Sequence, residues 1–417
     1  MSQVDRLDGW PPRAVRSGQN PAYRPTHRHY WLLHNSKVEH GSDFWSSRDV
    51  DIPPRSGAPA IRVAIWDSGV DTALFPERLA VDLDGRPLVR GYDSFKRRQD
   101  TPMAVLPASY AARHEELNSI LMAFDDIDGG VDSPAAKALT ERIESLSPSE
   151  RDQLTMEVGR WSGYAHGTAV ADIALAGHSR AEIIVARMEW WHGSPPVPRW
   201  SHELARREAD SIRDLLGFVV ESGARVVNMS WGRFEGSYLT NLEQSAPDMP
   251  LAERQALARE TVEMIRFELR EGMAAAPRVL FVGAAGNDGK TMLEANPATR
   301  FSLPNFLLVG AVDRTGSVAD YTNTGPEVTL YANGERVPAR LPGGLPSFAS
   351  GTSMAAPNVS NAAAKVLATD ARLSGAELRA LLEETADTNS TGQRLLHTAR
   401  AVEVAQAATY SNPEPTD

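Results

Sequence analysis

The stretch Gly351-Thr352-Ser353-Met354-Ala355-Ala356-Pro357 places a hydroxyl between a glycine turn and an alanine-rich helix. The first turn of a helix has free backbone N–H groups and carries the positive end of the helix dipole. These groups stabilise an alkoxide or a tetrahedral oxyanion, so the position favours nucleophilic attack by Ser353 on a carbonyl carbon. The alternative is that Ser353 only caps the helix, which is a common role for serine.

An apolar run ahead of Asp67 predicts a buried strand that ends in a carboxylate. The run reads Val63-Ala64-Ile65-Trp66-Asp67-Ser68-Gly69 and closes on a turn signal. Ligand and catalytic groups of open α/β sheets lie at the carboxyl ends of the strands, which makes Asp67 a candidate. The simpler interpretation is a turn or helix-capping aspartate.

Two further segments present a polar side chain beside glycine. Ala165-His166-Gly167-Thr168 runs into a helix of small residues, and Gly167 allows another part of the chain to approach closely. A second apolar run ends in Gly286-Asn287-Asp288-Gly289, which predicts a strand and then a turn that presents an amide. Asn287 either donates a hydrogen bond to developing negative charge or is a turn asparagine with positive φ.

Together these segments resemble the subtilisin-like serine peptidases, or subtilases. The chain order Asp67, His166, Ser353 matches that family and differs from other families with the same three residue types. The resemblance covers about residues 61–409 and includes a segment similar to the family strand that lines the substrate cleft, Val226-Val227-Asn228-Met229-Ser230-Trp231-Gly232.

The resemblance implies a role for each candidate residue in a serine endopeptidase. Ser353 attacks the scissile carbonyl, His166 accepts and returns the proton, and Asp67 holds the imidazole in one tautomer. Asn287 and the Ser353 backbone N–H bind the oxyanion. An extended peptide is expected to add along two segments that flank the cleft, formed by Ser230, Trp231, Gly232, Ala284, Ala285 and Gly286.

Two side chains beside this cleft suggest a cleavage preference. Trp231 is large enough to narrow or cover the pocket for the residue before the scissile bond. Asp288 lies at the rim of that pocket and favours a basic side chain there, unless it is an ordinary solvated turn carboxylate.

The chain departs from the family pattern at several positions. Ala169 and Asn358 stand where the family usually has histidine, and Asp172 stands where a helix glycine is common. Insertions are expected at about residues 96–160 and at about residues 234–272.

The first insertion is expected to form a helical subdomain beside the cleft. Ser147-Pro148-Ser149-Glu150 has the pattern of a capping box. Apolar residues recur ahead of it at helical spacing, at Ala136, Leu139, Ile143 and Leu146. In the second insertion, Val262, Ile265 and Leu269 share one face of a predicted helix.

From Ile61 onward, apolar runs alternate with amphipathic segments, which is the pattern of βαβ units. Continuous apolar runs suit parallel strands that are buried on both faces. We therefore predict a three-layer α/β/α fold with a mostly parallel central sheet, helical insertions and an N-terminal arm. Strands are expected at Arg62–Asp67, Glu182–Met188, Arg225–Ser230, Arg278–Gly283 and Phe306–Val309.

The expected organisation is an arm at residues 1–60, a peptidase domain at 61–409 and a disordered tail at 410–417. The 417 residues include no cysteine, which excludes disulfides and fits a reducing compartment. The first 20 residues lack the apolar core of a secretory signal, and no run approaches the roughly 18 apolar residues of a membrane span. A net charge of −11 argues against nucleic acid. We expect a cytoplasmic protein without membrane or nucleic-acid partners.

Two segments invite a metal interpretation. In the arm, His27, His29, His34 and His40 match no zinc signature. The acidic run at 125–132 offers oxygen ligands for Ca²⁺ but lacks the EF-hand register, so a solvated loop is the alternative. We predict that no metal or cofactor is required, and we keep calcium as a possibility at the acidic run.

Three functions remain open for the same residues. The first is a serine endopeptidase acting on a peptide or protein and regulated by its extensions or by an unidentified partner. The second is a catalytically silent binding protein with the same fold. The third is a peptide ligase or macrocyclase, in which an amine intercepts the acyl-enzyme.

Overall fold

The computed structural model describes residues 44–54, 60–128, 132–189, 198–295 and 297–411. The four histidines of the arm and the residues after 411 lie outside the described part. In the described part, no helix combines the length and the apolar character needed to cross a bilayer.

A nine-stranded sheet forms the centre of the fold, in the order β10-β11-β7-β6-β5-β4-β1-β3-β2. Its pairs are parallel except at one edge, where β10 and β11 run antiparallel. All five predicted strands are confirmed. The strands are β1 (Ile61–Asp67), β2 (Val89–Tyr92), β3 (Ala181–Met188), β4 (Val226–Met229), β5 (Leu280–Ala284), β6 (Phe306–Val312), β7 (Val328–Asn333), β10 (Asp387–Thr388) and β11 (Arg394–Leu395).

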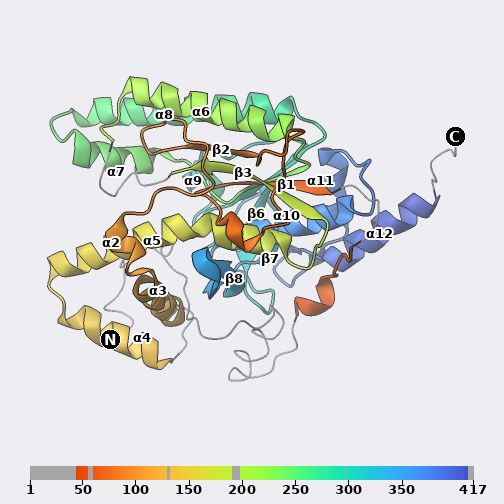
Figure 1. Ribbon diagram of the computed structural model, residues 1–417, viewed down its shortest axis with the longest axis horizontal. Coiled ribbons are helices and arrows are strands. Elements are labelled where there is room, and N and C mark those ends of the chain that lie inside the picture. The colour runs from red at the N-terminus through yellow and green to blue at the C-terminus, as the bar shows by residue number, and fades with distance from the viewer. Residues whose placement is uncertain (1–43, 55–59, 129–131, 190–197, 296, 412–417) are drawn as a thin grey trace.

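Helices cover both faces of this sheet, which confirms the three-layer α/β/α prediction (Figure 1). One face carries α5 (Pro148–Leu175), α10 (Thr352–Leu367) and α11 (Gly375–Glu384), with α12 (Thr398–Ser411) packed on α10. The other face carries α6 (His202–Glu221), α7 (Glu235–Ser245) and α8 (Leu251–Ala274). A separate hairpin, β8 (Val337–Leu341) and β9 (Leu345–Ala349), precedes α10. The shorter helices are η4 (Ser46–Arg48), η5 (Thr72–Leu74), α9 (Met292–Ala295) and η6 (Pro342–Gly344).

The first insertion is helical, as predicted, but it is not a separate unit. It forms α2 (Ala108–Ala111), α3 (His114–Asp128), α4 (Pro134–Ser145) and the first turns of α5. The capping box of Ser147 and Glu150 is present. The helix that begins there does not end near residue 160, because it continues without a break through His166 to Leu175. The inserted segment is therefore continuous with the helix of the candidate base.

Other sequence predictions are confirmed or corrected by the packing. Val262, Ile265 and Leu269 form the buried face of α8, which packs on α6. The acidic run is not a solvated loop at its start, because Asp125 and Asp126 belong to α3 and are buried. The predicted tail begins too early, since α12 extends to Ser411.

Buried charges join the loop after β2 to the helices on the far face. Lys96 Nζ lies 3.2 Å and Arg233 Nε lies 3.1 Å from Glu208 Oε1 on α6. Tyr238 on α7 donates to Glu208 Oε2 at 2.9 Å. Burial lowers the pKa of Lys96, and the Glu208 carboxylate beside it acts in the opposite direction.

We expect Glu208→Ala to lower the free energy of unfolding by about 3–5 kcal/mol, because it leaves two buried cations without their carboxylate. Glu203→Ala is the matched control, since Glu203 is an exposed residue of the same helix that pairs with Arg207, and it should cost less than about 1 kcal/mol. Urea denaturation measures both. Equal losses in the two variants would contradict this account.

Burial also lowers the pKa of His178, in the turn between α5 and β3, to about 4. Between pH 6.5 and 4, His178 is therefore protonated in the unfolded chain and neutral in the folded chain. The free energy of unfolding falls as the pH falls through this range. The loss reaches about 3 kcal/mol at pH 4 and is absent above pH 7. Denaturation of wild type and His178→Asn at pH 7 and pH 4.5 tests this. The variant should retain more of its pH 7 stability, and an unchanged acid loss would exclude His178 as the source.

Candidate active site

A buried carboxylate ends an interior strand of the parallel sheet. Asp67 is the last residue of β1, which lies between β3 and β4, and its exposed fraction is 0%. The Ser68 backbone N–H donates to Asp67 Oδ1 at 2.7 Å. A carboxylate at this depth requires hydrogen-bond donors. The interpretation of Asp67 as a turn or helix-capping residue does not by itself account for this burial, and its catalytic role stays a prediction.

The imidazole of His166 supplies a second partner for this carboxylate. His166 Nδ1 lies 2.8 Å from Asp67 Oδ1, and 16% of the side chain is exposed. Gly167 allows this approach, because a Cβ at that position would lie 2.9 Å from Asp67 Oδ1 and would also collide with the Gly69 carbonyl oxygen. The Gly167 N–H then donates to Ser68 Oγ at 3.2 Å. The predicted role of Gly167 in close packing is confirmed.

Ser353 is the second residue of α10 and does not cap this helix. The residue before the helix is Gly351, whose φ of 143° suits glycine. Ser353 is half-buried in the first turn of the helix. On either side of it, the Thr352 N–H donates to Asn287 Oδ1 and the Met354 N–H donates to the Gly351 carbonyl oxygen. The interpretation of Ser353 as a simple N-cap is therefore wrong.

The side-chain amide of Asn287 is held in one orientation. Its Oδ1 accepts hydrogen bonds from the backbone N–H and the hydroxyl of Thr352, both at 2.8 Å. The Nδ2 group therefore points away from Thr352. A Cβ built on Gly351 would lie 3.1 Å from Ser353 Oγ and 3.2 Å from Asn287 Nδ2. The hydroxyl and the amide donor therefore face the same small space, which Gly351 keeps free.

Three consecutive hydrogen bonds connect the interior of α10 to the backbone of Ser353. Ser360 on α10 donates to Asn228 Oδ1 at 2.9 Å, and Asn228 Nδ2 donates to Ser230 Oγ at 2.9 Å. The Ser230 hydroxyl donates to the Ser353 carbonyl oxygen at 2.8 Å. This chain ties the start of α10 to the end of β4.

The two predicted substrate segments follow neighbouring parallel strands. Ser230 and Gly232 come directly after β4, while Ala284 ends β5 and Gly286 follows with a φ of 101°. The two segments therefore lie at the same edge of the sheet as Asp67. Their contact with a peptide remains a prediction.

Trp231 and Asp288 have surroundings that the sequence did not reveal. Trp231 is buried, with its ring 5.1 Å from the ring of Trp66 on the α6 face of the sheet. A role for Trp231 as a cover of the substrate pocket stays a prediction. Asp288 is exposed, and its Oδ2 accepts a hydrogen bond from Asn323 at 3.1 Å. A preference for basic side chains through Asp288 also stays a prediction.

Sequence reasoning missed Thr352 and Ser360 as supporting residues. Thr352 stands beside Ser353 in the quoted motif, and its hydroxyl was the available signal. Ser360 had no such signal, because only the folded chain shows that it meets Asn228.

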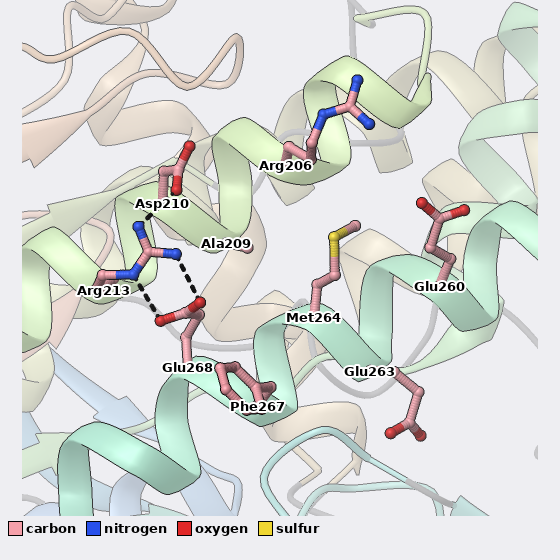
Figure 2. Close-up of a pocket in the computed structure, with 9 residues that line it drawn as sticks. All are labelled: Arg206, Ala209, Asp210, Arg213, Glu260, Glu263, Met264, Phe267 and Glu268. Atoms are coloured by element: carbon pink, nitrogen blue, oxygen red, sulfur yellow. Dashed lines mark hydrogen bonds and ion pairs between the residues drawn. The ribbon is translucent and has the colours of Figure 1, made fainter.

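A hollow of about 460 Å³ lies between α6 and α8, on the face of the sheet opposite to α5 and α10 (Figure 2). Arg213 in its wall pairs with Asp210 and Glu268. None of the candidate catalytic residues lines this hollow.

Within the described ranges, no group of three or more His, Asp or Glu residues is placed to hold a metal ion. Calcium at the acidic run stays a prediction, and residues 129–131 of that run lie outside the described part.

Comparison with known proteins finds similar chains that are named as proteases or serine proteinases. The thermophilic serine proteinase of Bacillus sp. (strain AK1) is 31% identical over 269 residues, which cover 63% of this chain and 55% of that protein. The cell wall-associated protease of Bacillus subtilis (strain 168) is 34% identical over 109 residues, or 26% of this chain and 12% of that protein. A solved cold adapted subtilisin-like serine proteinase is 16% identical, with a TM-score of 0.45, over 85% of this chain and 97% of that one.

The matched segments thus span about half or less of the length of these curated relatives. A model of the subtilase family, in contrast, matches residues 59–401, which include all four candidate catalytic residues and most of the chain. By this match, and with the motifs in the family order, the chain belongs to the subtilase family.

Proposed function

We propose that this protein is a serine endopeptidase that hydrolyses peptide bonds through an acyl-enzyme intermediate. The observation that carries the proposal is the 2.8 Å contact between His166 Nδ1 and the buried Asp67 Oδ1. A carboxylate only accepts hydrogen bonds, so this contact keeps a proton on Nδ1. Nε2 is then the basic nitrogen, which is the tautomer that a general base requires.

Ser353 is the nucleophile of the proposed reaction. Its Oγ attacks the scissile carbonyl carbon while His166 Nε2 takes the hydroxyl proton and passes it to the leaving amine. Water then attacks the acyl ester, and its proton returns to Ser353 through the same imidazole. The packing of α10 against both α5 and β1 supports this pairing of nucleophile and base.

Asn287 is the proposed side-chain donor to the oxyanion. Thr352 occupies the amide oxygen, so the amide turns its Nδ2 group toward the space beside Ser353 Oγ. A donor that is already oriented loses little free energy to reorganisation when charge develops. The peptide substrate would lie extended between the segments that follow β4 and β5.

We also propose that the activity is regulated, because an endopeptidase without control threatens other proteins around it. The first insertion is the favoured regulatory element, since it is continuous with the helix of His166. The cytoplasmic location and the regulatory partner stay predictions.

Replacement of Ser353 by alanine is expected to abolish turnover without loss of folding. A fluorophosphonate probe should label the wild type at Ser353, and it should not label Ser353→Ala. The measurements are labelling followed by peptide mapping, and circular dichroism of both proteins. Wild-type protein that is folded but unlabelled would contradict the proposal. Mass spectrometry of the reaction products separates hydrolysis from ligation.

Asn287→Ala is expected to lower kcat about 10²–10³-fold with little change in KM, because the lost donor acts on the transition state. This range is known from the loss of one oxyanion donor in an enzyme of the same family. Steady-state kinetics on a chromogenic peptide tests it. A rise in KM at unchanged kcat would place Asn287 in ground-state binding instead.

A further inference from the structure

The hairpin of β8 and β9 leads directly into the turn of the candidate nucleophile. At its base, Val337 pairs with Ala349. One residue further out, the Arg336 backbone N–H donates to Ser350 Oγ at 3.0 Å. The Gly351 N–H donates to the Gly334 carbonyl oxygen at 2.7 Å. The backbone on both sides of Arg336 therefore sets where Gly351 and the start of α10 lie.

Arg336 has a conformation that non-glycine residues rarely adopt. Its φ is 47°, in the left-handed region, and Lys96 is the other described non-glycine residue with positive φ. Such a conformation persists only where surrounding contacts hold it, and it often marks a functional site. The contacts of Arg336 should therefore show what holds its backbone in this conformation.

The side chain of Arg336 reaches the inserted helix α3. Its Nη1 lies 3.0 Å from Asp126 Oδ1, and 10% of the Asp126 side chain is exposed. The guanidinium also stacks over the ring of Phe348 in β9, 5.1 Å from its centre. Helix α3 itself packs against both β9 and α5. The ion pair thus links the insertion to the base of the hairpin.

A second arginine, Arg340 within β8, anchors the hairpin to another helix. Arg340 Nε lies 2.8 Å from Asp172 Oδ1, and the Arg340 backbone N–H donates to Asp172 Oδ2 at 2.8 Å. Asp172 belongs to α5, six positions after His166. One end of β8 is therefore fixed to the helix of the base, and the other end is fixed to the inserted helix.

We propose that Arg336 is a positioning residue for catalysis and that Asp126 makes the inserted helix α3 a part of the catalytic apparatus. The pair holds the turn at Ser350 and Gly351, and through it the space that Ser353 Oγ and Asn287 Nδ2 share. This inference rests on the proposed peptidase function. Its consequence is that any partner that displaces α3 lowers turnover without contacting the substrate.

The test compares kcat and KM of Asp126→Asn and Arg336→Gly with those of Glu116→Gln. Glu116 is the matched control, because it lies on the same helix but pairs with Arg113 and Arg142 inside the insertion. Asp126→Asn and Arg336→Gly should lower kcat between about tenfold and a hundredfold, as expected for a displaced catalytic group. KM should change less than twofold, and Glu116→Gln should match the wild type.

Arg336→Gly separates positioning from a merely structural role. Glycine accepts a φ of 47° without strain, so this variant removes the ion pair without straining the backbone. Because it leaves the mostly buried Asp126 without its cation, kcat is taken per titrated active site, which excludes any loss caused by unfolded protein. The double variant Asp126→Asn/Arg336→Gly should lose no more kcat than the worse single variant, because the two residues act as one unit.

Three results would overturn the inference. These are a kcat per titrated active site within twofold of wild type in both variants, an effect confined to KM, and losses that multiply in the double variant. Labelling of wild-type Ser353 by the fluorophosphonate keeps the outcomes distinct. If the wild type is labelled and the variants equal it, only the inference fails, whereas an unlabelled wild type removes the proposed function.

Discussion

The buried carboxylate of Asp67 is the constraint on which the rest of the site depends. Removal of a carboxylate from water costs several kcal/mol unless hydrogen-bond donors compensate. Asp67 Oδ1 meets two such groups, the Ser68 N–H and His166 Nδ1. The second of these fixes α5 to the end of β1. The close approach of α5 to β1 also accounts for glycine at position 167, because a side chain there would collide with Asp67 and Gly69.

Helix α5, which carries His166, also contacts the elements that position Ser353. Through Asp172 it holds Arg340 in the hairpin that leads to Ser353. At its C-terminal end, the carbonyl oxygen of Ala174 accepts a hydrogen bond from Asn361 on α10 at 2.9 Å. Helix α5 therefore contacts the strand of Asp67, the hairpin that precedes Ser353 and the helix that carries Ser353. The insertion lengthens this same helix, so it is placed to influence all three.

Local signals predicted the elements that depend on neighbouring residues. The capping box at Ser147 and the apolar runs that became strands were recognisable because their causes lie within a few positions. The acidic run was misjudged at Asp126, since acidic residues favour exposed loops on average. Asp126 is buried in α3, where Arg336, 210 positions away, supplies the opposite charge. Trp231 was similarly ambiguous until its partner Trp66 was known.

From the amino-acid chain alone one can read which chemical groups are present, their order and the glycines that leave room beside them. The direction in which those groups point depends on the folded structure. The amide of Asn287 has two chemically different ends, and the motif around it does not state which end faces Ser353. Thr352, 65 positions away, settles the question by occupying the oxygen. Orientation of this kind depends on partners that are distant in sequence, because hydrogen bonds require direction and contact rather than proximity along the chain.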